Sequence, residues 1–287
     1  MIILQTTICH KNTIHFIMYS LADRKKGYKM NYKNTFAADF ERLDKNYAKP
    51  DAFISEMAKN SDTIRALILQ GPPGVGKTHS VEQSLKKHAA GRYQLINGKV
   101  TNLSLYGSLY NASSNGHILF LDDCDTFLND VTGVNILKAA MDTKPEREIH
   151  WESGTHYLKA MGVPTSFKFN GSVILNTNIG YDNHNKKYIS RLSALQDRAL
   201  VITISDTDPD RLFKQVCYMV LVQDMLRNYK FSTLEKNMLL KWIDDNRDYI
   251  NRISLRTIIK LSNIYSADKN SWKDMAEQGL LSGVDYA

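Results

Sequence analysis

The sequence predicts an α/β fold, a parallel sheet of about five strands with flanking helices, followed by a small all-α domain. Three observations predict this class. Short apolar segments alternate with amphipathic, helix-like segments between residues 64 and 204, as a parallel sheet covered by helices requires. From Pro209 onward the apolar period is helical only. The run GPPGVGKT at residues 71–78 directly follows the first apolar segment, and this pattern joins a strand to a helix in phosphate-binding loops.

Each element is assigned from its apolar period and its flanking residues. We expect strands at 64–69, 93–96, 118–121, 172–176 and 200–204. Helices are expected in the α/β part at 79–88, 103–110 and 134–141, and in the C-terminal part at 210–227, 233–249, 255–265 and 272–281. A polar amphipathic stretch, 32–60, precedes them. The predicted domains are an N-terminal extension (1–49), a nucleotide-binding α/β domain (50–206) and a helical lid domain (207–287).

Composition excludes several classes of protein. With 287 residues, 43% of them apolar, the chain can bury a full core. Its three cysteines lie far apart without a CxxC pair, which argues against a disulfide framework or a zinc site and favours the cytoplasm. No apolar run reaches the ~18 residues that span a bilayer, so no membrane association is expected. The formal charge of +7 falls to +3 without residues 1–29, which carry five basic residues and one acidic residue, so basicity is weak support for nucleic acid.

The first 29 residues look unlike the remainder, with scattered apolar residues and no sustained period. The chain from Met30 reads like a natural beginning. Our hypothesis is that residues 1–29 are an upstream start that is not translated in the cell, and the alternative is a genuine flexible tail. The intact mass of the native protein decides between the two, because a mass that includes Met1 would refute the hypothesis.

The loop at 71–78 has every fixed position of the pattern GxxxxGK[ST]. Its glycines allow successive backbone N–H groups to surround phosphates, and the helix after the loop directs its positive end at them. The lysine can reach the β- and γ-phosphates, and the threonine hydroxyl is placed to bind Mg²⁺. The expected cofactors are therefore ATP and Mg²⁺. The expected nucleotide-binding residues are Gly71, Pro72, Pro73, Gly74, Val75, Gly76, Lys77, Thr78 and His79.

A later apolar strand, ILFL at 118–121, ends in acidic residues. This segment resembles a Walker B motif, which implies that Asp122 joins Thr78 as a Mg²⁺ ligand. The next position of that motif usually carries a glutamate that polarises the attacking water. Here it is Asp123, one methylene shorter, so its reach is reduced and Asp125 is the alternative for this task.

Two further segments resemble motifs of AAA+ ATPases. SVILNTN, residues 172–178, resembles the sensor 1 strand, which implies that Asn178 orients the water at the γ-phosphate. Asn176 is the alternative, and an asparagine that merely caps a turn is the plainer interpretation. YISRLSALQDRALVITI, starting at Tyr188, resembles the segment that supplies an arginine finger to a neighbouring subunit. Arg198 matches best and Arg191 is the alternative; a surface ion-pairing arginine is the plainer interpretation for both.

In the helical domain, NRISLRTIIKLSNIY begins a helix with Arg256 near its amino end and resembles sensor 2, which links the lid to the bound nucleotide. Together these motifs resemble the AAA+ family over roughly residues 50–287, most closely the compact stand-alone ATPases of tailed bacteriophages. The resemblance implies an ATP hydrolase with catalytic roles for Asp123, Asn178, Arg198 and Arg256. It also implies a homo-oligomeric, hexameric ring in the host cytoplasm.

The segment 146–171 has strand-like ends and resembles the hairpin inserted before sensor 1 in AAA+ helicases. His156, Tyr157 and Lys159 would lie near its tip, mixing stacking and positive charge as single-strand binders do. The alternative is that its aromatic residues, Trp151, Phe167 and Phe169, are packing residues.

The turn at 97–101 occupies the place of a pore loop and carries Lys99 but no aromatic residue, which argues weakly against a protein unfoldase. The leading hypothesis is remodelling of DNA or of a DNA-replication assembly, as motor, loader or remodeller, with DNA or a replication protein as partner. The alternatives are a protein-remodelling chaperone and an ATP-gated scaffold with slow hydrolysis.

Overall fold

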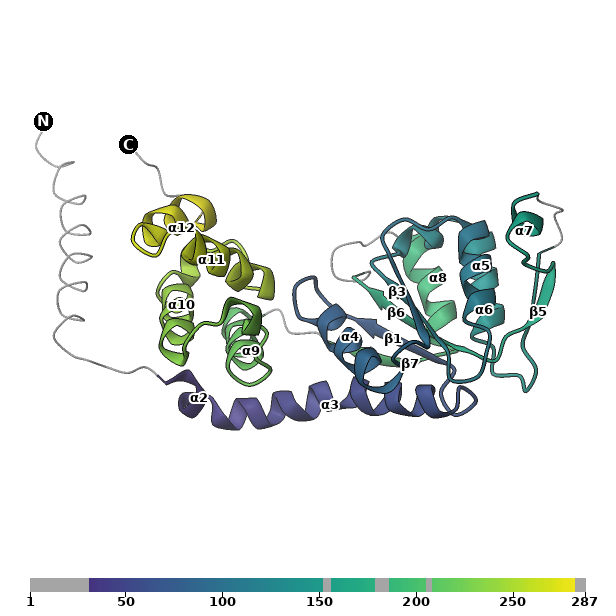
Figure 1. Ribbon diagram of the computed structural model, residues 1–287, viewed down its shortest axis with the longest axis horizontal. Helices are drawn as coiled ribbons and strands as arrows, with labels where there is room; N and C mark the ends of the chain where they lie inside the picture. The colour runs from purple at the N-terminus through teal and green to yellow at the C-terminus, as the bar shows by residue number, and fades with distance from the viewer. Residues whose placement is uncertain (1–30, 152–155, 179–185, 205–207, 282–287) are drawn as a thin grey trace, which may run out of the picture.

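The computed structural model describes residues 31–151, 156–178, 186–204 and 208–281 (Figure 1). The hypothesis about residues 1–29 lies outside these ranges. Five parallel strands form one sheet in the order β2-β3-β6-β1-β7. Their bounds are β1 Ala66–Gln70, β2 Tyr93–Asn97, β3 Ile118–Asp122, β6 Ser172–Thr177 and β7 Leu200–Thr203. The predicted fold class is confirmed. Because β6 lies between β1 and β3, the carboxyl ends of these three strands are neighbours.

Helices cover both faces of the sheet, because successive strand residues point to opposite sides. One core packs residues such as Ile68 and Leu121 against α5 (Asn102–Asn111), α6 (Val131–Ala140) and α8 (Lys186–Gln196). The other packs residues such as Leu67 and Phe120 against α3 (Ala37–Lys59) and α4 (Lys77–His88). The domain is therefore a three-layer sandwich, and the carboxyl ends of its parallel strands all lie at one edge of the sheet.

The lid contains α9 (Pro209–Leu221), α10 (Thr233–Asp245), α11 (Leu255–Ala267) and α12 (Trp272–Leu280), with single 3₁₀ turns η2 (Arg227–Tyr229) and η3 (Arg247–Tyr249). Two of these helices, α9 and α10, end several residues earlier than expected. Past α9, Asp224 adopts a left-handed conformation with φ of 50°, which a continuous helix does not allow. At the end of α10, the Asn246 side chain donates to the Trp242 carbonyl at 2.8 Å and caps the last turn.

The helix α3 crosses the expected boundary between the N-terminal extension and the α/β domain. It continues through residues 49 and 50, although Pro50 lies inside it. Together with the short α2 (Tyr32–Thr35), its first half packs Phe40 into the lid core, whereas its second half packs Ile54 into the sheet core. Figure 1 shows this helix running beneath both domains. Residues 31–49 are thus part of the lid packing, and one helix joins the two domains.

The expected hairpin before β6 is present. β4 (Glu148–His150) pairs antiparallel with β5 (Ser166–Lys168), and α7 (His156–Ala160) lies between them in the chain. Phe169 is fully buried, and the Phe167 ring lies 5.1 Å from that of Tyr106 on α5. The packing interpretation is confirmed for these aromatic residues.

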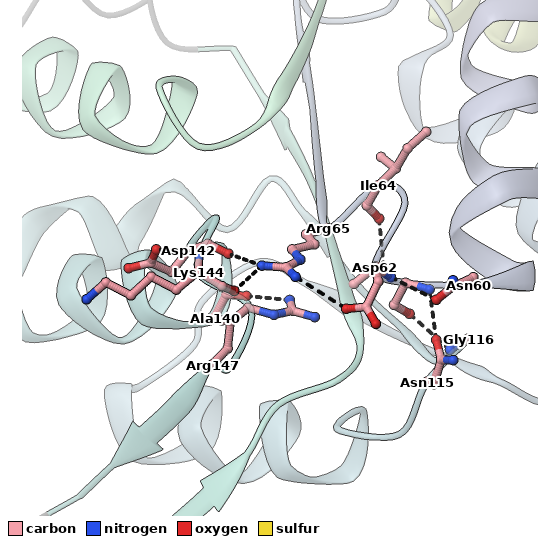
Figure 2. A network of polar contacts seen from close by, with 12 residues as sticks. Asn60, Asp62, Ile64, Arg65, Asn115, Gly116, Ala140, Asp142, Lys144 and Arg147 are labelled. Atoms are coloured by element: carbon pink, nitrogen blue, oxygen red, sulfur yellow. Dashed lines mark hydrogen bonds and ion pairs between the residues drawn. The ribbon is translucent and has the colours of Figure 1, made fainter.

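Figure 2 shows the polar network at the amino-terminal edge of the sheet, the edge opposite the phosphate loop. Arg65, just before β1, donates to the carbonyls of Asp142, at 3.1 Å, and Lys144. Nearby, Arg147 donates to the Ala140 carbonyl at 2.8 Å. These bonds anchor the start of β1 to the segment after α6. No helix within the described ranges is long and apolar enough to cross a membrane.

Candidate nucleotide site

The phosphate loop connects β1 to α4 and takes its shape from three glycines. Gly74 and Gly76 have φ of 80° and 91°, a region that residues with a Cβ rarely adopt. Gly71 is needed for a different reason, since a Cβ there would lie 2.4 Å from the Ile204 carbonyl oxygen. Gly76 precedes the first residue of α4, so the positive end of a 12-residue helix opens onto the loop. His79 lies half-buried in the first turn of α4, and burial lowers its pKa.

Lys77 is buried, with 6% of its surface exposed. Its ammonium group donates to the Gly71 carbonyl at 2.7 Å, the Pro72 carbonyl at 3.0 Å and Asn178 Oδ1 at 2.7 Å. A buried cation requires such partners. The three bonds hold the charge at the mouth of the loop, beside the tip of β6.

Thr78 and Asp122 meet as the sequence predicts. The Thr78 hydroxyl lies 2.9 Å from Asp122 Oδ1 and 3.0 Å from Oδ2, and Asn176 Nδ2 donates to Oδ1 at 2.8 Å. Asp122 is only 2% exposed. Burial raises the pKa of its carboxyl group, the bonds from Asn176 and Thr78 oppose that rise, and the charge of Asp123 adds to it. A cation bound here would relieve this penalty.

The two candidate general bases lie in different surroundings. Asp123 is exposed, has φ of 49°, and accepts a hydrogen bond from Asn178 Nδ2 at 3.0 Å. Asp125 is half-buried, and burial raises its pKa, while hydrogen bonds from the Thr177 side chain and the Asn178 backbone oppose the rise. Asn178 therefore bridges Lys77 and Asp123, whereas the alternative, Asn176, bonds to Asp122.

The lid rests directly on the phosphate loop. The Leu255 backbone N–H, at the start of α11, donates to the Gly74 carbonyl at 3.0 Å. A cleft of 280 Å³ opens beside this contact, and Arg256 lines it. The full lining is Pro73, Gly74, Ile250, Asn251, Arg252, Ser254, Arg256, Thr257, Lys260, Gly279 and Leu280. Arg256 thus lies next to the loop, together with two further cations that sequence reasoning did not single out.

Sequence reasoning also missed two side chains that hold the loop from behind. Tyr47 of α3 and Gln215 of α9 both donate to the Val75 carbonyl, at 2.8 and 2.5 Å. The Val75 side chain is buried in the lid core. A sequence signal existed for Tyr47, which follows Tyr32, Phe36, Phe40 and Leu43 at helical spacing.

The two candidate arginine fingers differ in position: Arg191 lies in the middle of α8, and Arg198 lies just past its carboxyl end. Arg191 donates to the Leu128 carbonyl in the turn after β3, at the same edge of the sheet as the phosphate loop. Arg198 donates to the Ala194 carbonyl at 2.7 Å and precedes β7, where Leu200 pairs with Leu67 near the start of β1. Arg198 is therefore at the edge away from its own phosphate loop.

The residues present fit a nucleotide with Mg²⁺. Mg²⁺ is usually held by one or two carboxylates together with substrate phosphates, which the Thr78–Asp122 pair can provide. Two buried oxygens at this edge, Asn176 Oδ1 and Asp125 Oδ1, have no hydrogen-bond partner among the described residues. A buried oxygen without a hydrogen-bond donor destabilises the folded protein, and a bound ligand or water can supply the missing partner.

No protein-family model matches the chain. Over 219 residues it is 32% identical to an uncharacterised 36.7 kDa protein of Enterobacteria phage T4, from the nrdC-mobD intergenic region, and the alignment covers 74% of this chain and 67% of the phage protein. Among solved structures, it resembles domain III of the Thermotoga maritima replication initiation protein DnaA, with 13% identity, a TM-score of 0.44, and coverage of 82% of this chain and 92% of that one. A DNA replication initiation factor matches with 12% identity, a TM-score of 0.41, and coverage of 88% and 66%. At identities this low, the ligands and partners of these two solved proteins are not assigned to this chain.

Proposed function

We propose that this chain, which belongs to the same family as the phage T4 protein and folds as an AAA+ core with a helical lid, binds ATP with Mg²⁺ and hydrolyses it. One observation carries the proposal. Asn178 joins the phosphate-loop Lys77, at 2.7 Å, to the Asp123 carboxylate, at 3.0 Å. Phosphate binding, metal binding and a water-orienting pair thereby meet at the carboxyl ends of β1, β3 and β6.

Each side chain has a distinct task in this proposal. Bound Mg²⁺·ATP supplies the transferable phosphoryl group and a metal that stabilises the developing charge. The loop N–H groups and Lys77 bind the phosphates, and Thr78 and Asp122 hold the metal. The Asn178 amide orients a water against Asp123, whose carboxylate accepts the proton. Asp125 is the alternative acceptor.

The test is Mg²⁺-dependent phosphate release from ATP. Asp123→Asn and Asp125→Asn, which each remove one candidate base, identify which carboxylate accepts the proton. Wild-type protein that binds no ATP, or hydrolysis unchanged in Lys77→Ala, would refute the proposal. Asp123→Glu supplies the side chain that the Walker B motif usually carries. If this variant is much faster than a very slow wild type, an ATP-gated scaffold becomes the better function.

We also propose that the active form is a homo-oligomeric ring, expected to be hexameric. Its support is the placement of Arg198 at the sheet edge opposite its own phosphate loop. From there the arginine can complete only a neighbour's site, where its charge would stabilise the transition state. Sedimentation with and without ATP tests the assembly.

For the target, we propose DNA or a DNA-replication assembly. Three side chains are exposed: Lys99, two residues after β2, and His156 and Lys159, on the hairpin insertion. None of these three takes part in an ion pair with a described residue. Two of the three are lysines, whose exposed ammonium groups suit a phosphate backbone. ATPase rates with and without single-stranded DNA at low salt test this, and stimulation by an unfolded protein instead would favour the chaperone.

A further inference from the structure

We infer that Tyr47 of α3 and Gln215 of α9 are positioning residues of the nucleotide site, which orient a phosphate-binding N–H group through the Val75 carbonyl. The inference rests on the proposed ATP binding. It extends the nucleotide site to two elements beyond the strands and the phosphate loop, and Tyr47 lies in the segment expected to be an N-terminal extension.

The contacts converge on a single carbonyl oxygen. Tyr47 Oη donates to it at 2.8 Å and Gln215 Nε2 at 2.5 Å, and the same Gln215 amide also contacts Tyr47 Oη. Gln215 is only 4% exposed. The Tyr47 ring stacks on Tyr218, with centroids 5.5 Å apart and planes 12° apart, which fixes the direction of the phenol. Burial raises the pKa of Tyr47 to about 12, so the phenol remains a donor at neutral pH.

The geometry of the peptide bond turns these contacts into a constraint on the phosphate site. The Val75 carbonyl and the Gly76 N–H belong to one planar trans peptide, in which they point in opposite directions. Donors that hold the carbonyl toward α3 and α9 therefore hold the Gly76 N–H toward the opposite side. In a loop of this pattern, phosphates are bound by the inward-facing N–H groups.

The preceding peptide is held in the same way. The Leu255 N–H donates to the Gly74 carbonyl at 3.0 Å, which orients the Val75 N–H. Two successive N–H groups of the loop are thus oriented by residues of α3, α9 and α11, which lie outside the loop itself. Without such donors, the peptide before Gly76 would rotate easily, because glycine adopts φ of either sign.

The experiment compares Tyr47→Phe, Gln215→Met and the double variant with a matched control. The control is Tyr32→Phe. Tyr32 Oη donates to Asp244 Oδ2 at 2.6 Å, so this variant also removes one phenol bond between the N-terminal segment and the lid, but at a site remote from the loop. The measurements are ATP dissociation constants, KM and kcat at a temperature well below melting, and the free energy of unfolding by urea.

Each single variant is expected to weaken ATP binding about threefold to tenfold, and the double variant about tenfold or more, as the loss of one and two hydrogen bonds predicts. KM should rise while kcat changes less than about twofold, because no residue that contacts the reacting atoms is altered. Tyr32→Phe should lose stability similar to that of Tyr47→Phe and keep its ATP affinity.

Wild-type ATP affinity in the double variant would overturn this inference alone and leave the proposed function intact. An equal loss of affinity in Tyr32→Phe would also overturn it, because the effect would then follow from stability. Wild-type protein that binds no ATP would end both proposals together.

Discussion

Gly74→Ala tests the contact between the lid and the phosphate loop. Gly74 has φ of 80°, and a Cβ at this position would lie 2.8 Å from Ser254 Cβ, in the N-cap residue of α11. The substitution therefore introduces two separable penalties. One is the left-handed backbone conformation, which belongs to the loop. The other is the clash, which exists only if the lid rests on the loop as the Leu255–Gly74 bond indicates.

The two penalties have different expected sizes. A left-handed conformation costs a residue with a Cβ about 1 to 2 kcal/mol. Forcing a methyl group against a packed neighbour costs a further ~1 to 3 kcal/mol. Gly91→Ala isolates the first penalty, because Gly91 has φ of 74° and a Cβ there would meet no atom of the described residues within 4 Å beyond its chain neighbours. Gly74→Ala should therefore destabilise the protein by about 1 to 3 kcal/mol more than Gly91→Ala.

Urea denaturation of the ligand-free protein measures both variants, and a second substitution identifies the source of the difference. Ser254→Gly removes the clashing Cβ at little cost, because glycine replaces serine at an N-cap for a few tenths of a kcal/mol. In the background of Gly74→Ala it should remove the clash penalty and leave the backbone penalty. Equal costs for Gly74→Ala and Gly91→Ala, or no recovery in the double variant, would refute lid docking at this position.

Three further predictions concern the proposed chemistry. Lys77→Ala should weaken ATP binding on the order of 100-fold, measured by calorimetry, because it removes the only side-chain cation of the loop. Asp122→Asn should lower Mg²⁺-dependent turnover on the order of 100-fold, yet stabilise the ligand-free protein at neutral pH in urea denaturation. The sign follows from the raised pKa of Asp122. Between the ordinary pKa of an aspartate and this raised pKa, the folded protein binds more protons than the unfolded chain, so the stability of the wild type falls as the pH rises through this window. The Asp122→Asn variant carries no charge at this position and does not lose this stability. Arg198→Ala should lower turnover on the order of 1000-fold and keep its ATP affinity. Mixing Arg198→Ala subunits with Lys77→Ala subunits should restore part of the phosphate release. If Arg198→Ala alone retains its turnover, Arg198 has no role in a neighbour's site.

The sequence was sufficient for those parts of the fold that depend on local pattern. Each buried strand is an uninterrupted apolar run that ends in polar residues, so the ends of β3 and β6 could be located within one residue. Parallel strands place such ends at one edge, which is why Asp122 and Asn178 could be expected beside Lys77. Their catalytic roles stay predictions.

Features that depend on long-range packing could not be read in the same way. Pro50 removes one backbone hydrogen bond from α3, which favours a boundary there on local grounds. Burial of Phe40 in one core and Ile54 in the other outweighs that loss, and it requires both domains to be in place. The same limit applies to Gln215, a polar residue among the buried residues of α9, whose partner is 140 residues away in the chain.

Lid position and nucleotide binding are coupled in both directions in this arrangement. If the lid donors set the orientation of the loop N–H groups, then nucleotide binding must bias the lid by the same free energy, since linkage between two equilibria is reciprocal. The lid cannot rotate freely, because α3 is packed on both domains and would have to bend. Pro50, whose nitrogen cannot donate to the carbonyl of residue 46, leaves the turn of α3 around it with one backbone hydrogen bond fewer to oppose bending. Lid movement can therefore reach the sheet by two routes, through α3 and through the direct bonds of α9 and α11 to the phosphate loop.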